Sequence, residues 1–333
     1  MTASPPPLPV GVVGVGSLGQ HHARLYASLP EARLVGVFDT RTDRAAEIAR
    51  QFRTKAYPSL DALLADVEAV SVVVPTTAHH EVGLAALARG RHVLVEKPIA
   101  AALGEAEELV SAADKAGVLL QTGHVERFNR ALRAAAPYLA SPKFIESDRV
   151  APFAARGSDV AVILDLMIHD LDLVLALVGE RVVDVRASGI GVVTPSVDIA
   201  TARIEFASGA VANLTASRLA RERVRKLRIF QPSGYFSLDL AAGKGEHLRL
   251  KPDAQRRIAG GETDLAKLVE RIKLDAPEAE PLGLELQNFV RAVRGTERAA
   301  VTGADGLSAL ALAFRVLEAV RRGAGAPAAL PGA

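Results

Sequence analysis

One apolar stretch carries three ionisable side chains at helical spacing. Between Val160 and Val174, all residues are apolar except Asp165, His169, Asp170 and Asp172. Spacings of four and three residues place Asp165, His169 and Asp172 on one helix face. Asp170 lies off that face and is expected to cap a helix or to pair with a cation. A polar stripe on a buried helix is costly unless it is paired or lines a pocket. A neutral imidazole accepts protons near neutral pH, and a neighbouring carboxylate can orient it. The pattern predicts an acid–base site; a hydrogen-bonded core histidine is the plainer interpretation.

A lysine follows another apolar run, in Glu96-Lys97-Pro98 after residues 91–95. If that run is a strand of a parallel sheet, Lys97 stands at its carboxyl end, where ligands bind in such sheets. An ammonium group there can stabilise an oxygen anion that develops during a reaction. The sequence leaves open the isomer of Pro98, and a solvated loop lysine is the alternative.

A glycine-rich run, Gly14-Val15-Gly16-Ser17-Leu18-Gly19, joins an expected strand to an expected helix. This context is typical of a dinucleotide-binding loop. Gly14 permits the tight turn, Gly16 lets a pyrophosphate approach the backbone beside Ser17 and Leu18, and Gly19 allows the helix to pack on the strand. The run predicts NAD or NADP as cofactor.

Asp39 favours NAD of these two cofactors. It stands 20 residues after Gly19, at the end of the second expected strand, where a carboxylate accepts hydrogen bonds from the ribose hydroxyls. Such a carboxylate repels a 2′-phosphate. Arg41 and Arg44 are close enough in sequence to weaken this preference, and we expect Arg41 to contact the cofactor.

Other candidates carry less signal. Residues 122–129 join the two halves of the chain, so Arg127 and Asn129 are candidates for substrate binding, with an ordinary linker as the alternative. Arg156 precedes the polar helix and is a candidate partner for an anionic substrate. Asp172 is the third residue of the polar stripe and a further substrate candidate.

No metal site is expected. The adjacent pairs His21-His22 and His79-His80 are candidate metal ligands, but no cysteine or convincing set of carboxylates completes either site.

The first third of the chain alternates short apolar runs with helical stretches. Strands are expected at 10–15, 33–38, 69–74, 91–95 and 118–122, and helices at 18–28, 41–52, 78–89 and 103–116. This alternation predicts a Rossmann domain, a doubly wound parallel sheet covered by helices on both faces, over residues 1–123.

The pattern changes in residues 124–333. Strands are expected at 143–150, 181–193, 199–206, 210–217, 225–230 and 235–240, and helices at 159–178, 282–293 and 306–322. Turn signals at Ser208-Gly209 and Pro232-Ser233-Gly234 indicate hairpins. We expect an α+β domain with a large, open, mostly antiparallel sheet that binds substrate. Too few helices follow to cover both sheet faces, so a homodimer or homotetramer is expected.

Composition excludes several classes of protein. The 333 residues include 40 Lys and Arg against 38 Asp and Glu, a net charge of +2 that predicts no nucleic-acid binding. There is no cysteine, and no apolar run reaches the ~18 residues of a membrane span. The first residues lack the pattern of a signal peptide. A cytoplasmic protein is expected.

Together these features resemble the Gfo/Idh/MocA family of NAD(P)-dependent sugar oxidoreductases, over nearly the whole chain. The shared features are the glycine run, Pro75 followed by His79, Glu96-Lys97-Pro98 and Asp165-x-x-x-His169. The resemblance implies an active site of Lys97, Asp165 and His169. It also implies that cofactor contacts come from Pro75, Thr76, His79, Glu96 and Lys97.

A narrower resemblance is to the UDP-N-acetylglucosamine 3-dehydrogenase branch of this family. It rests on residues 123–129 and 164–170, and on 203–206 with 212–218. It implies a nucleotide-sugar substrate oxidised at its C3 hydroxyl, and an aminotransferase that acts on the ketone in pathways toward diamino-sugar lipid A. Arg130 departs from the branch, which usually has proline there.

Three alternatives remain at this point. The first is an inositol or free-sugar dehydrogenase of the same family, and the second is a reductase that uses NADPH. A regulator that binds NAD without turnover is the third, although such a protein would not need Lys97 or His169. The sequence also leaves open which of these two residues is the ultimate base.

Overall fold

The computed structural model describes residues 6–154 and 160–323. By its internal contacts the chain divides into two compact units, Met1–Phe128 with Ala279–Leu310, and Asn129–Glu278 with Ala311–Ala333. The sequence suggested a single boundary after residue 123. The structure differs, because a segment near the carboxyl end returns to the first unit.

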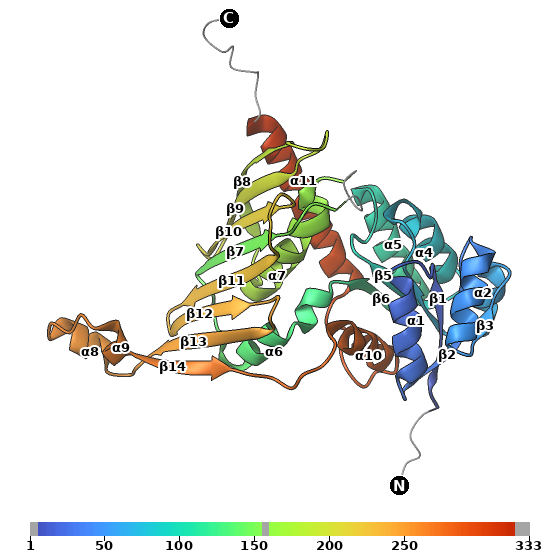
Figure 1. Cartoon of the computed structure of the whole chain (residues 1–333), viewed down its shortest axis with the longest axis horizontal. Coiled ribbons are helices and arrows are strands. Elements are labelled where there is room, and N and C mark those ends of the chain that lie inside the picture. The colour runs from blue at the N-terminus through green and yellow to red at the C-terminus, as the bar shows by residue number, and fades with distance from the viewer. Residues whose placement is uncertain (1–5, 155–159, 324–333) are drawn as a thin grey trace, which may run out of the picture. The chain divides into compact units, whose positions relative to one another are not determined.

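The first unit is built on a six-stranded parallel sheet with the order β3-β2-β1-β4-β5-β6 (Figure 1). The strand order reverses beside β1, which lies between β2 and β4. In sheets of this kind, ligands bind outside the carboxyl ends of the strands at such a reversal. The strands are β1 (Leu8–Val13), β2 (Ala32–Phe38), β3 (Lys55–Ala56), β4 (Ala69–Val72), β5 (His92–Glu96) and β6 (Leu120–Gly123).

Helices connect these strands, as the sequence predicted. They are α1 (Gly19–Ser28), α2 (Thr42–Gln51), α3 (Leu60–Asp66), α4 (His79–Leu87) and α5 (Leu103–Ala116), with short 3-10 turns η1 (Thr76–Ala78) and η2 (Val125–Phe128). β3 and α3 were not expected from the sequence, because both are short. The hydroxyl of Ser59 caps α3 by accepting a hydrogen bond from the Ala62 amide at 3.2 Å.

Helix α10 (Pro281–Val293) belongs to the first unit although it lies far along the chain. Its Leu286, Phe289 and Val290 are buried in the same core cluster as Val10 and Tyr26. The sequence showed the helix but assigned it to the second domain. Local periodicity reveals an apolar face without revealing which surface that face meets.

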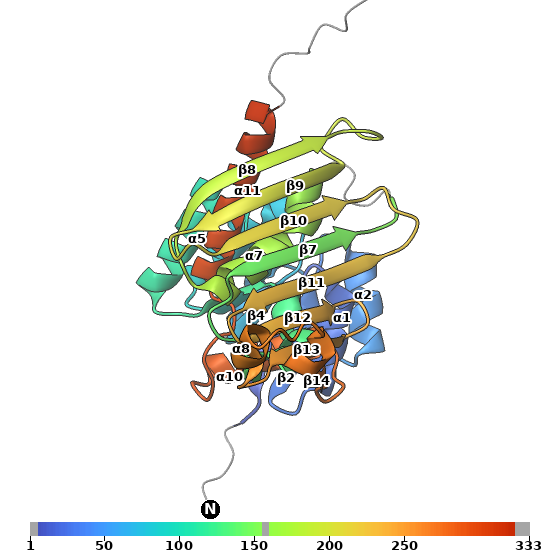
Figure 2. The same ribbon diagram turned by 90° about the vertical axis from the view of Figure 1, so that its left-hand side faces the viewer.

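The second unit contains an eight-stranded sheet with the order β14-β13-β12-β11-β7-β10-β9-β8 (Figure 2). All neighbours are antiparallel except β10 and β7. The expected mostly antiparallel sheet is thus confirmed. Its strands are β7 (Phe144–Val150), β8 (Val182–Ile190), β9 (Ile199–Phe206), β10 (Val211–Ser217), β11 (Val224–Gln231), β12 (Gly234–Asp239), β13 (Lys244–Leu250) and β14 (Val269–Leu274). The last two strands were not expected.

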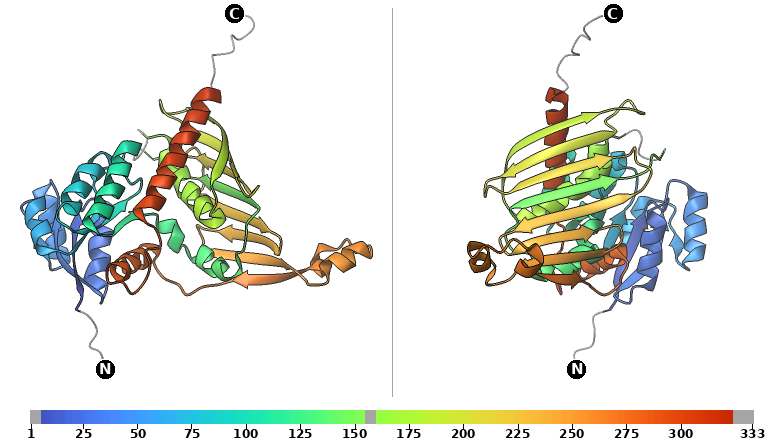
Figure 3. Two further views of the ribbon diagram at one scale, coloured as in Figure 1. Left: turned by 180° about the vertical axis from the view of Figure 1, so that it is seen from behind. Right: turned by 60° about the vertical axis from the view of Figure 1, so that its left-hand side comes forward.

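One face of this sheet packs on helices and the other is open. Along β7, Ile145, Ser147 and Arg149 are buried, whereas Phe144 and Glu146 on the opposite face are only partly covered. Helix α7 (Ile168–Val178) lies against the buried face (Figure 3). The period-two alternation of the strand explains this division.

The remaining helices of the chain are short, apart from α11. They are α6 (Arg130–Ala135), the 3-10 turn η3 (Ala136–Tyr138), α8 (Ala254–Ala259) and α9 (Leu265–Leu268), while α11 (Gly303–Gly323) begins in the first unit and ends in the second. The long helix expected at 159–178 starts with a π-helical segment, Ile163–Met167, and continues as α7. The first residue of the expected helix lies outside the described residues.

Candidate active site

The glycine loop after β1 has the geometry that a bound dinucleotide requires. Gly14 has a φ of +82°, in the left-handed region that glycine tolerates. A Cβ atom on Gly19 would lie 1.9 Å from the Gly14 carbonyl oxygen, so only glycine allows α1 to pack there. A Cβ on Gly16 would meet no atom within 4 Å, so the space beside this backbone is open. These residues fit a pyrophosphate group.

Asp39 lies at the end of β2 and is tied to the glycine loop. Its Oδ2 accepts a hydrogen bond from the Val15 amide at 2.8 Å, and its Oδ1 accepts one from the Arg41 amide at 2.9 Å. Both oxygens retain lone pairs that can accept ribose hydroxyls. The Arg41 side chain is exposed and lies 3.4 Å from Asp43. The backbone of Arg41 thus helps to orient the Asp39 carboxylate.

Lys97 follows β5, at the carboxyl edge of the sheet, and is half-buried. The Lys97–Pro98 peptide bond is cis, which the sequence had left open. Its neighbour Glu96, for which the resemblance implied a cofactor contact, is buried. Glu96 Oε1 pairs with His22 Nε2 of α1 at 3.0 Å, and Oε2 accepts from the Lys97 amide at 3.3 Å. Burial alone would raise the pKa of Glu96, but the contacts with His22 and Lys97 outweigh it and lower this pKa.

His79, for which the resemblance also implied a cofactor contact, makes contacts within the chain. Its side chain is 1% exposed, with Nδ1 2.9 Å from the Pro98 carbonyl oxygen and Nε2 3.0 Å from that of Val74. The ring thus ties the chain after β4 to the chain after β5. Burial lowers its pKa, against the opposing effect of these carbonyl groups. Pro75 and Thr76, exposed and half-buried beyond β4, remain candidates for cofactor contact.

The second unit carries the predicted acid–base residues on one helical run. Asp165 lies in the π-helical segment and His169 in the first turn of α7, and both are half-buried. A π-helical turn within an α-helix frequently marks a functional site. Asp172 is 1% exposed, two turns after Asp165.

An ion pair that the sequence only half predicted holds this run against the sheet. Asp170 was expected to cap a helix or pair with a cation, and its partner is Arg149 of β7. Arg149 Nε and an Nη donate to the two carboxylate oxygens at 2.7 and 3.0 Å, and both side chains are buried. The alternation along residues 144–150 places Arg149 on the inner face, and this signal would have identified it.

Asn129, a predicted substrate residue, makes hydrogen bonds within the second unit. It caps α6 by accepting from the Ala131 amide at 3.0 Å, and it donates to the Leu240 carbonyl at 2.8 Å. These two hydrogen bonds give Asn129 a role in the local fold. Arg127 lies in η2 of the first unit and is half-buried, while Arg156 lies outside the described residues.

Arg130, which departs from the resemblance, has a visible role. It begins α6 and binds the chain after β14, donating to the Ala276 carbonyl and to Asp275, both at 2.7 Å. The proline expected there would lack these hydrogen bonds.

Two negative findings concern residues 6–154 and 160–323. No three His, Asp or Glu side chains among them gather into a group that could hold a metal ion. No helix among them is long and apolar enough to cross a membrane.

Comparison with known proteins decides the family. Residues 8–124 match the model of an oxidoreductase family with an NAD-binding Rossmann fold, and residues 144–237 match the GFO/IDH/MocA C-terminal domain. A UDP-N-acetylglucosamine 3-dehydrogenase of Acidithiobacillus ferrooxidans is 41% identical, over 93% of this chain and 96% of the relative. The chain belongs to the Gfo/Idh/MocA family of oxidoreductases.

One further relative and one solved structure extend this comparison. The myo-inositol 2-dehydrogenase of Thermotoga maritima is 29% identical, over 92% of this chain and 94% of the relative. Among solved structures, UDP-N-acetylglucosamine 3-dehydrogenase GnnA from Acidithiobacillus ferrooxidans superposes with a TM-score of 0.86 at 38% identity, covering 95% of this chain and 98% of that one. The predicted fold and family are thereby confirmed.

Proposed function

We propose that this protein oxidises the C3 hydroxyl of UDP-N-acetylglucosamine to a ketone, with NAD as the oxidant. The observation that carries the proposal is the 41% identity to a UDP-N-acetylglucosamine 3-dehydrogenase along almost the whole length of both chains. The inositol dehydrogenase relative, at 29% identity, makes oxidation of a polyol the weaker candidate.

The side chains of this protein divide the chemical work as follows. The glycine loop and Asp39 would hold NAD, which would supply the acceptor for the hydride on the carbon that bears the hydroxyl. In this proposal His169 accepts the hydroxyl proton, and Asp165, one turn earlier, orients the imidazole and stabilises its charged form. Lys97 stabilises the negative charge that develops on the oxygen. Lys97 is the alternative base, because its side chain in the neutral amine form can accept the proton of that hydroxyl.

Arg127 and Asp172 remain our candidates for substrate binding. A UDP-sugar carries a diphosphate, to which a guanidinium group can donate two parallel hydrogen bonds. The 3-keto product is reactive, so we expect an aminotransferase that converts the ketone to an amine to act next.

The direct test measures the absorbance of NADH as it forms with a panel of compounds. We expect turnover with UDP-N-acetylglucosamine in the presence of NAD, and much slower turnover with free N-acetylglucosamine and with myo-inositol. An aminotransferase added to the reaction would remove the ketone and favour oxidation. Faster oxidation of myo-inositol would favour the polyol alternative, and cofactor binding without turnover of any compound would favour a regulator.

We predict that the protein binds NAD more tightly than NADP, because of Asp39. Replacing Asp39 with alanine should weaken NAD binding about tenfold or more, since hydrogen bonds to charged groups contribute roughly 1.5–3 kcal/mol each. The preference for NAD over NADP should become smaller, because the repulsion of the 2′-phosphate is lost. Calorimetric titration of the unaltered protein and of Asp39→Ala with both cofactors measures these changes. Tighter binding of NADP by the unaltered protein would reject the prediction.

We also propose that the open sheet face joins copies of the chain in a dimer or tetramer. On this face Phe230 contacts Phe144 and Tyr235, with ring centroids 5.9 and 4.6 Å apart. The charges around this aromatic row are already paired across strands, as Lys226 is with Asp239 at 2.7 Å. Paired charges cost less to bury than isolated ones.

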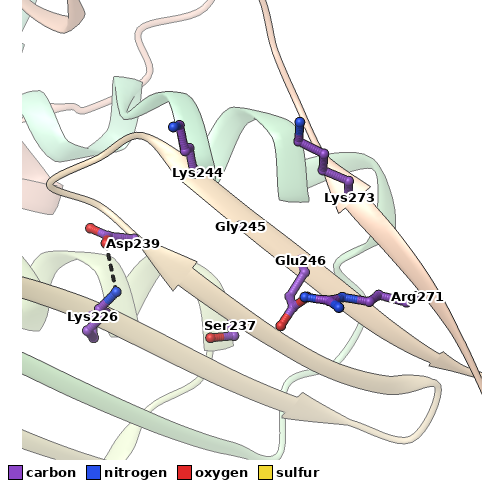
Figure 4. Close-up of a pocket in the computed structure, with 8 residues that line it drawn as sticks. All are labelled: Lys226, Ser237, Asp239, Lys244, Gly245, Glu246, Arg271 and Lys273. Atoms are coloured by element: carbon purple, nitrogen blue, oxygen red, sulfur yellow. Dashed lines mark hydrogen bonds and ion pairs between the residues drawn. The ribbon is translucent and has the colours of Figure 1, made fainter. Parts of the chain in front are cut away.

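A depression of about 440 Å³ lies on the same face (Figure 4). It is lined by Lys226, Ser237, Asp239, Lys244, Gly245, Glu246, Arg271 and Lys273. Arg271 pairs with Glu246 across it. An uneven surface whose charges are largely paired within the chain suits contact with another protein surface.

Light scattering should therefore show a dimer or tetramer at micromolar concentration. Phe230→Asp should dissociate it, because a carboxylate would be buried against apolar rings. Phe153→Asp is the matched control, since Phe153 is 49% exposed and lies outside the strands. A monomer in the unaltered protein, or equal dissociation by both substitutions, would contradict this use of the sheet face.

A further inference from the structure

Arg44 of α2 makes an unusual set of contacts for an arginine on a surface helix. Its Nε donates to the Val15 carbonyl and one Nη to Gln20 Oε1, both at 2.9 Å, while the other Nη donates to Glu47 at 2.7 Å. Its side chain is 18% exposed. Three hydrogen bonds in different directions fix the guanidinium plane against the glycine loop.

Gln20 connects Arg44 to a second position of the glycine loop. Its Oε1 accepts from Arg44, and its Nε2 donates to the Ser17 carbonyl at 3.1 Å. Arg44 and Gln20 together therefore bind two loop carbonyls, those of Val15 and Ser17. Asp39 holds the same loop through the Val15 amide.

These contacts determine where the next amide groups point. Gly16 and Leu18 follow trans peptide bonds, since the one cis bond found in the described residues is Lys97–Pro98. In a trans peptide the carbonyl and the following N–H point in opposite directions. With the Val15 carbonyl bound to Arg44, the Gly16 N–H points away from Arg44. With the Ser17 carbonyl bound to Gln20, the Leu18 N–H points away from Gln20.

Backbone N–H groups in a glycine-rich loop are the donors that bind phosphate oxygens. We propose that Arg44 is a positioning residue for the cofactor: with Gln20 it presents the Gly16 and Leu18 amides to the pyrophosphate, and it does not bind the 2′-phosphate of NADP. This inference rests on the proposed use of a dinucleotide. It assigns to Arg44 a role opposite to the one that its proximity to Asp39 suggests.

The test is calorimetric titration with NAD and NADP, which needs no sugar substrate. Arg44→Met keeps the length of the side chain but removes all three hydrogen bonds. We expect the dissociation constants of both cofactors to rise about tenfold or more, with their ratio unchanged within about twofold. Arg50→Met is the matched control on α2, because exposed Arg50 bonds only the Ala46 carbonyl of its own helix among the hydrogen bonds found. It should change both constants less than about twofold.

Further variants separate positioning from a general effect on folding. Gln20→Leu should also weaken the binding of both NAD and NADP. Its effect should not add fully to that of Arg44→Met, because both side chains belong to one hydrogen-bond network. Arg44→Lys should restore part of the affinity. The melting temperature of each variant is measured without cofactor, since a purely structural role would lower it while leaving affinity of the folded protein unchanged.

Two results would overturn the inference: NAD binding within twofold of normal in Arg44→Met, or a loss of NADP affinity much larger than that of NAD affinity. The second result would make Arg44 a ligand of the 2′-phosphate. If the unaltered protein bound neither cofactor, the proposed function itself would fail. If the unaltered protein bound NAD and either of the two results above were found, only the inference about Arg44 would fail.

Discussion

Lys97→Ala and His169→Ala are each expected to lower kcat at least ~100-fold in the oxidation of UDP-N-acetylglucosamine, the usual scale for loss of acid–base help. Both side chains are half-buried, so neither fills a core and the fold should survive. His169 lies on α7 of the second unit, whereas the glycine loop belongs to the first. NAD affinity should therefore change little in His169→Ala. Steady-state kinetics, circular dichroism and calorimetry together measure these effects.

Three comparisons sharpen this result. His80→Ala is the matched control, because His80 lies on α4 and pairs with exposed Glu108 at 2.8 Å. Asp165→Asn should cost less than either alanine variant, since an amide can still hold an imidazole. The losses in the Lys97→Ala/His169→Ala double variant should not add if both residues act on one oxygen. Near-native turnover by His169→Ala would remove α7 from the active site and leave a buried core histidine as the better interpretation.

Arg149→Met is expected to destabilise the protein by about 3–5 kcal/mol, the scale for leaving one member of a buried ion pair alone. Asp170, immediately after His169, would then be a buried carboxylate without this guanidinium. Because Asp170 lies in the first turn of α7, next to His169, kcat should fall as well. Urea denaturation followed by circular dichroism measures the free energy of unfolding.

The partner variant and an exposed pair provide the controls. Arg149→Met/Asp170→Leu should recover much of the lost stability, because no buried charge remains. Arg228→Met breaks the exposed pair with Glu146 at 3.2 Å, on the other face of the same sheet, and should cost about 1 kcal/mol or less. Equal costs for Arg149→Met and Arg228→Met would show that the buried pair has no special role.

The sequence by itself determined the features that depend on neighbouring residues. Alternation of apolar runs with helical stretches predicted the parallel sheet, because strands buried on both faces must be apolar throughout. The glycine spacing predicted the loop, since backbone conformation and close packing at Gly14 and Gly19 exclude larger residues. Turn residues at 208–209 and 232–234 predicted two hairpins. In the structure, β9 pairs antiparallel with β10 and β11 pairs antiparallel with β12.

Only the tertiary structure decided which partner each polar side chain has. Glu96, His79 and Asn129 were predicted to bind a ligand, and in the structure each also contacts a group distant in sequence: His22, the backbone of Pro98, and that of Leu240. A buried polar atom must find a partner, and a single sequence does not say whether that partner is a ligand or the chain itself.

For the same reason, the packing partners of α10, Arg149 and Arg44 could not be predicted from the sequence. The periodicity of residues 281–293 showed an apolar face, but its burial against β1 and α1 depends on a fold that closes over more than 250 residues. The Arg149–Asp170 pair joins a strand to a helix, and Arg44 meets a loop 29 residues earlier. Local rules fix what each segment becomes, while the contacts that orient the site arise only when distant segments pack together.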